Sequence, residues 1–162
     1  PLHDEQALFE LLCLETYQAS LSWETILNKR TAFQQAFHHY DYHQVAKMTD
    51  EDLEEILQNP AVVRNRLKIF ATRANAQAFL QVQQDFGSFD HYIWSFVDGK
   101  TIQNDLLDYK QAPAKTTLSE QISKDMKKRG FKFVGPVAVY SFLQAAGLVN
   151  DHERTCDFHS PH

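Results

Sequence analysis

The chain has 162 residues, of which 43% are hydrophobic and 23% are charged, as is typical of one globular domain with a hydrophobic core. No apolar run is long enough to span a bilayer, and no signal or transit peptide is recognisable, so we expect a cytoplasmic protein with no membrane partner. The net charge of −5 argues against non-specific nucleic-acid binding by the whole surface. The cysteines, Cys13 and Cys156, lie far apart and do not suggest a disulfide framework.

The spacing of apolar residues predicts an all-α fold, because these residues recur at helical intervals through most of the chain. No stretch shows the alternation of apolar and polar residues that is typical of a half-buried strand. The chain has no internal repeat and no long linker, so we expect one compact helical domain over residues 1–162. The predicted helices cover residues 4–16, 22–38, 43–47, 50–58, 64–85, 88–97, 117–129 and 136–146.

Local sequence signals set the boundaries of these helices. Residues 49–52 (TDED) and 117–120 (TLSE) resemble capping boxes, and Asn59-Pro60 is a further start signal. Residues 100–116 have the least regular pattern, and residues 148–162 form a polar tail that is rich in histidine. Glycines that follow predicted helices are expected to end them: Gly87, Gly130 and Gly147.

Residues 117–146 form the first feature that indicates a function, because a short apolar turn bounded by glycines joins two predicted helices there. The second helix begins directly after Gly135, so its first N–H groups and its dipole would suit a DNA phosphate. Lys132 and the basic run 127–129 would strengthen that attraction. The pattern resembles a helix-hairpin-helix element, with Lys132 where a second glycine is usual. The alternative is an ordinary helical hairpin with solvated lysines.

A carboxylate and an aromatic residue flank the break after the first predicted helix. Glu15 follows an apolar run, and Trp23 begins the second helix. A carboxylate with apolar walls could recognise a cationic or amino-bearing base, while Trp23 stacks on its face. Leu21 could fill the gap that a flipped nucleotide leaves. The alternative is that Glu15 is a surface residue near a helix end and Trp23 a core residue.

The polar tail contains candidate metal ligands. His152 and Cys156 lie four residues apart, and His159 follows them. Histidine and cysteine both bind zinc, but a closed structural zinc site needs four ligands. A histidine-rich end of a chain is otherwise typical of a disordered terminus.

Three stretches together resemble the DNA-3-methyladenine glycosylase I family. They are residues 8–23, with LFE, CLE and QASLSW; residues 92–97, YIWSFV; and residues 127–135, KKRGFKFVG, which continue into YSF, QA and GLVNDH up to residue 152. The third stretch is the most specific, and the similarity runs to about Cys156. The resemblance implies a helical helix-hairpin-helix glycosylase that hydrolyses the N-glycosidic bond of 3-methyladenine in alkylated double-stranded DNA.

The resemblance also implies roles for individual residues. Glu15 matches the acid that contacts the methylated base, and Trp23 matches an aromatic residue of the base pocket. Leu21 lies where the family has a residue near the flipped-out nucleotide. His152 and Cys156 match two of four ligands of a structural zinc ion, and no organic cofactor is expected.

The sequence departs from the family pattern at its N-terminal end. Pro1 matches a point just after the family's N-terminal segment, which supplies a Cys and a His as the other two zinc ligands and aromatic residues that help to enclose the base. His3 is not at the matching position, and Ser20 stands where a glycine is usual. We therefore expect a chain without this segment, either a piece of a longer protein or a natural variant, with two of the four zinc ligands.

The chemistry of the methylated base indicates a mechanism. Methylation at N3 makes adenine cationic, and the base leaves as a neutral molecule, so the protein mainly flips the nucleotide, holds it and admits water. Glu15 would select the methylated base through charge and hydrogen bonds. No residue is an evident general base, although Asp151 stands where related glycosylases often keep a catalytic aspartate.

Two other classes of function remain open from the residues alone. A non-catalytic hairpin module would bind DNA in a salt-sensitive way and would be indifferent to base damage. A helical interaction protein would not bind DNA at low salt, and its functional surface would be an exposed apolar patch. The resemblance favours a glycosylase, which we expect to be a monomer.

Overall fold

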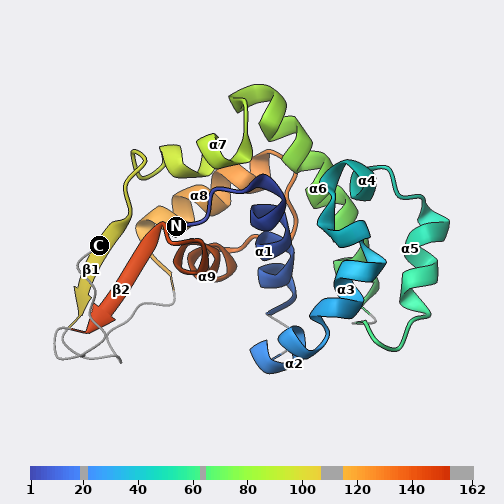
Figure 1. Ribbon diagram of the computed structural model, residues 1–162. Coiled ribbons are helices and arrows are strands. Elements are labelled where there is room, and N and C mark those ends of the chain that lie inside the picture. The colour runs from blue at the N-terminus through green and yellow to red at the C-terminus, as the bar shows by residue number, and fades with distance from the viewer. Residues whose placement is uncertain (19–21, 63–64, 107–114, 154–162) are drawn as a thin grey trace.

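The computed structural model describes residues 1–18, 22–62, 65–106 and 115–153. The fold is all-α, as predicted, with one pair of short strands beside the helices (Figure 1). The elements are α1 (Glu5–Gln18), α2 (Trp23–Asn28), α3 (Arg30–Ala36), a 3-10 helix η1 (His38–Tyr40), α4 (Tyr42–Ala46), α5 (Asp50–Leu57), α6 (Arg66–Phe86), α7 (Phe89–Ser95), β1 (Ile102–Leu106), α8 (Thr117–Lys128), α9 (Pro136–Ala146) and β2 (Val149–Glu153).

Helix α1 lies at the centre of the fold, between α9 on one side and α6 on the other (Figure 1). Its N-terminal end is fixed by the carboxylate of Glu5, which accepts hydrogen bonds from the backbone N–H groups of Phe89 at 2.7 Å and Asp90 at 2.8 Å. A negative charge at the positive end of α7 is a favourable arrangement. Helix α1, whose last turn contains Glu15, is thereby attached to α7 at its N-terminal end and packs against α6 and α9.

Aromatic side chains dominate the core around α1. Phe79 of α6 is fully buried, with its ring centroid 4.6 Å from that of Phe89 and 5.3 Å from that of Phe9. Cys13 is fully buried, as its apolar helix predicts, and burial raises the pKa of its thiol well above the ordinary value. This core fixes the relative positions of α1, α6 and α7.

The described residues confirm most of the predicted helices and correct three details. The predicted helix 22–38 is divided into α2 and α3, because Lys29 has non-helical torsion angles between them. Asn65, and not Asn59, caps the long helix α6, while the Asn59 side chain accepts a hydrogen bond from Ala61 N–H in a turn. The box at 49–52 is confirmed, whereas the box of α8 lies one residue earlier than predicted, with Thr116 and not Thr117 as the cap.

The prediction of no strand is wrong for β1 and β2, which form a parallel pair with Ile102 opposite Val149 and Asp105 opposite His152. Both segments are polar and lack alternation, so their side chains carry no strand signal. A parallel pair needs a long crossover connection, which α8 and α9 provide here. The pairing is therefore set by the helices that bring the two segments together.

Among the described residues, no helix combines the length and the apolar character that crossing a membrane requires.

Candidate active site

Glu15 lies in the last turn of α1, and its carboxyl group is buried. The residue is 4% exposed, and its Oε2 atom has no hydrogen-bond partner among the described residues. Burial raises the pKa of this carboxyl group from 4.5 to about 7. A buried polar atom without a partner destabilises the fold. Such an atom in a cavity is therefore typical of a group that binds a ligand.

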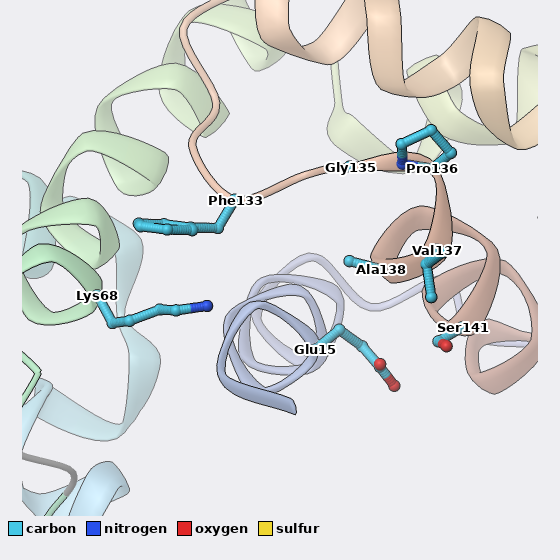
Figure 2. A pocket seen from close by; sticks show the side chains of 8 residues that line it. All are labelled: Glu15, Lys68, Phe133, Gly135, Pro136, Val137, Ala138 and Ser141. Atoms are coloured by element: carbon cyan, nitrogen blue, oxygen red, sulfur yellow. The ribbon is translucent and has the colours of Figure 1, made fainter. Parts of the chain in front are cut away.

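Glu15 lines a cavity of about 480 Å³ between the C-terminal turn of α1, α6 and the turn that leads into α9 (Figure 2). This volume lies within the range of pockets that hold small organic ligands. The walls are mainly apolar, and two charged side chains reach the cavity. Its lining residues are Glu15, Lys68, Phe133, Gly135, Pro136, Val137, Ala138 and Ser141.

Lys68 is the second charged residue of the cavity. It is 6% exposed, and its ammonium group donates a hydrogen bond to the carbonyl oxygen of Thr16 in the last turn of α1. Carbonyl groups at a helix C-terminus carry partial negative charge and favour a cation there. The Lys68 nitrogen also lies 4.2 Å from the centre of the Phe133 ring, below which the side chain extends in Figure 2. Burial lowers the pKa of Lys68.

The turn between α8 and α9 is fixed by buried polar side chains. The amide of Asn75 on α6, which is fully buried, accepts a hydrogen bond from Lys132 N–H at 2.7 Å and donates one to Lys132 C=O at 3.2 Å. The hydroxyl group of Ser123 on α8 donates to Val134 C=O at 2.6 Å. The turn is thus attached to both α6 and α8, and its backbone has a defined position relative to the cavity.

The N-terminus of α9 opens onto the same cavity as Glu15. Gly135 is the N-cap, without a side-chain hydrogen bond, and Pro136 occupies the first helical position. Val139 N–H bonds to Gly135 C=O at 2.9 Å. The N–H groups of Val137 and Ala138 have no hydrogen-bond partner among the described residues, as expected for the first turn of a helix. A helix N-terminus of this kind binds anions, phosphate among them.

The basic residues before the turn divide into two groups. Arg129 is bound to the protein, because its Nε donates to the Asp125 carboxylate at 2.8 Å and its guanidinium carbon lies 4.6 Å from the centre of the Phe86 ring. The side chains of Lys127, Lys128 and Lys132 are exposed. Arg129 therefore holds the hairpin to the rest of the fold, and the lysines are available to an anionic partner.

Residues 1–160 match the family described as methyladenine glycosylase. The chain belongs to this family. It is 45% identical over 156 residues to the DNA-3-methyladenine glycosylase of Haemophilus influenzae, and the aligned region covers 96% of this chain and 84% of that protein. DNA-3-methyladenine glycosylase 1 of Escherichia coli K12 is 44% identical over 156 residues, with 96% and 83% of the two chains covered.

Solved structures of methyladenine glycosylases have the same fold. A structure that describes 3-methyladenine recognition by 3-methyladenine DNA glycosylase I from Staphylococcus aureus matches with a TM-score of 0.95 at 41% identity, over 100% of this chain and 86% of the other. The solution structure of a 3-methyladenine DNA glycosylase I matches with a TM-score of 0.90 at 42% identity, over 100% and 87% of the two chains. These likenesses confirm the fold class and the family that the sequence indicates.

The structure brings some of the predicted site residues together. Glu15 and Gly135 line one cavity, and Lys132 lies in the turn beside it with an exposed side chain. Trp23 is the first residue of α2, capped by the Ser22 side chain, but its own side chain is outside the described part. Leu21 lies outside the described residues altogether. The roles of these residues in the methyladenine glycosylase site remain predictions.

The predicted zinc ligands are only partly described. His152 lies in β2, opposite Asp105 of β1, whereas Cys156 and His159 lie outside the described residues. Among the side chains that the structure describes, which do not include that of His152, no group of three or more His, Cys, Asp and Glu is placed to hold a metal ion. His3 contacts Asp90 and stacks on the Trp94 ring at 4.6 Å. A structural zinc ion stays a prediction from the sequence.

Sequence reasoning missed Lys68 and Phe133 as residues of the cavity. Lysine in a long helix is usually solvated, and a phenylalanine in an apolar turn is usually a core residue. A signal was present on α6, where Lys68, Thr72 and Asn75 follow one another at intervals of four and three residues, so they share one face of the helix. All three are buried. Polar side chains on a buried helix face indicate a site or a structural clamp.

Proposed function

We propose that this chain hydrolyses the N-glycosidic bond of 3-methyladenine in double-stranded DNA, as a base-excision repair glycosylase. The observation that carries the proposal is the buried Glu15 carboxyl group, whose Oε2 atom lacks a partner among the described residues, in one cavity with the N-terminus of α9. These features match the two charges of the substrate: a cationic methylated base and an anionic phosphate. The names of the relatives at 44–45% identity support the same activity.

In this mechanism the target nucleotide leaves the base stack and enters the cavity. Its phosphate accepts hydrogen bonds from the N–H groups of Val137 and Ala138, and nearby lysines attract the duplex without reading its sequence. The ionised carboxylate of Glu15 binds the methylated base, and the low polarity around it strengthens this contact. Trp23 stacks on the base, and Leu21 occupies the space that the nucleotide leaves.

The bond to the methylated base is already weak, because the base departs as a neutral molecule. The protein therefore contributes mainly by holding the nucleotide in place and admitting a water molecule. The water forms the new C–O bond and loses a proton to the solvent, while the electron pair of the broken C–N bond leaves with the base and neutralises it. Unmodified adenine has no positive charge to be stabilised by Glu15, so it binds less well. This difference in binding accounts for selection of the damaged base.

Release of free base from duplex DNA tests this proposal. We expect the chain to release 3-methyladenine from DNA methylated at adenine N3 and to release no adenine from the same unmodified duplex, measured by chromatography of the free bases. DNA binding without release from methylated DNA would contradict the proposed reaction and favour a binding module. Equal release of adenine and 3-methyladenine would contradict the role given to the charge of the base.

A further inference from the structure

The backbone of Phe133 has an unusual conformation for an aromatic residue. Its φ angle is +58°, in the left-handed region that bulky side chains rarely adopt. The other left-handed position of the hairpin, with φ of +98°, is occupied by Gly130. Phe133 is also 41% exposed, so its ring does not complete the core. A strained backbone at the edge of a cavity indicates a constraint from function.

Several buried polar groups hold Phe133 in this conformation. Asn75 binds the backbone of the preceding residue, and Ser123 binds the carbonyl oxygen of the following one. Lys68 extends below the ring, with its nitrogen 4.2 Å from the ring centre. The exposed fractions of Asn75, Ser123 and Lys68 are 0%, 2% and 6%. The position of the ring is therefore fixed by hydrogen bonds to the residues before and after Phe133 and by the Lys68 ammonium group that lies against one face of the ring.

The ring lies on the cavity wall, across from Glu15, on the turn that precedes the N-terminus of α9 (Figure 2). A nucleotide with its base at Glu15 and its phosphate at the first N–H groups of α9 would lie between these two points. The apolar surface of Phe133 then faces the nucleotide from the side of the turn. Aromatic rings pack well against sugars and bases, whatever the base sequence.

We infer that Phe133 is a substrate-contact residue, whose ring packs against the flipped-out nucleotide as the wall of the cavity across from Glu15. The inference deepens the proposed glycosylase activity and rests on it. It explains why the turn places a phenylalanine, and not a glycine, at a left-handed position. It also gives the buried Lys68 a role, because the ammonium group fixes the orientation of the ring.

The Phe133→Gly variant separates a substrate contact from a structural role. Glycine adopts a positive φ without strain, and the ring is only partly buried, so the melting temperature should stay equal to or above that of the unsubstituted chain. Loss of one aromatic contact should lower single-turnover release of 3-methyladenine roughly 10- to 100-fold. Phe133→Tyr keeps the ring and should retain most of the release rate.

Leu67→Ala is a matched control, because Leu67 is 70% exposed on α6 and lies outside the cavity lining. It should change neither release nor melting temperature. Phe133→Gly with an unchanged release rate would overturn the inference, and so would a loss of release that parallels a lower melting temperature. If the unsubstituted chain releases no base, the proposed function fails. Binding to a duplex with an abasic-site analogue then decides: weaker binding by Phe133→Gly supports the contact, and equal binding overturns it.

Discussion

Glu15→Gln should lower the release of 3-methyladenine about 100-fold, because a neutral amide replaces the carboxylate that binds the cationic base. Hydrogen bonds to charged groups contribute about 1.5–3 kcal/mol each, more than bonds between neutral groups. The substitution keeps the size and shape of the side chain, so the cavity stays intact. Single-turnover release at saturating protein measures the effect, and near-normal release would remove Glu15 from the mechanism.

The same substitution should stabilise the fold at high pH. The pKa of Glu15 is raised by burial from 4.5 to about 7, so the folded chain holds a proton that the unfolded chain releases between these values. The stability that this proton provides is complete below pH 4.5 and is lost as the pH rises to 7. Glu15→Gln should therefore be about 1–3 kcal/mol more stable than the unsubstituted chain at pH 8, and nearly equal to it at pH 4.5, in urea denaturation.

Replacement of Lys127, Lys128 and Lys132 by Gln should weaken binding to duplex DNA 10-fold or more at low salt. These side chains are exposed on the hairpin, and the structure leaves them available for phosphate. Each lysine that contacts a phosphate contributes about 0.9 to the slope of log affinity against log salt concentration, so the triple variant should show a flatter dependence. Titrations by fluorescence anisotropy at several salt concentrations measure both effects.

Two single variants provide the controls for this prediction. Lys47→Gln removes an exposed charge at the end of α4, which contributes no residue to the cavity lining or to the hairpin, and should leave the salt dependence unchanged. Arg129→Gln breaks the ion pair with Asp125 and the contact with the Phe86 ring. It should therefore lower the melting temperature and leave the salt dependence of DNA binding nearly unchanged. An unchanged salt dependence in the triple variant would place the DNA surface elsewhere.

Features that depend on residues close together in the sequence could be predicted. The helix periods, the glycine ends and the hairpin at 117–146 all follow from local patterns, and the structure places Gly135 and Glu15 in one cavity. The β1–β2 pair could not be predicted, because its polar segments carry no strand signal and their pairing depends on the arrangement of α8 and α9 between them. The break at Lys29 also follows from packing, since no proline or glycine marks it.

Of the residues that line the cavity, the sequence predicted Glu15 and Gly135. Glu15 stands out because it ends an apolar helix, whereas Lys68 and Phe133 enter the cavity from α6 and from the turn before α9 through contacts between distant segments. The left-handed conformation of Phe133 is likewise set in part by Asn75, which bonds to the backbone of Lys132, 57 residues later in the chain. No local pattern contains such a constraint, so these residues become visible only in three dimensions.

The ionisation of Glu15 is the most direct test of the central claim, that a buried carboxylate in this cavity binds the methylated base. Carbon NMR of the labelled side chain, with Glu15→Gln to assign the signal, gives the pKa with and without 3-methyladenine. The structure predicts a pKa of about 7 in the free chain, and a lower pKa in the complex, because base donors favour the charged form. An ordinary pKa near 4.5, or one that the base leaves unchanged, would contradict the account.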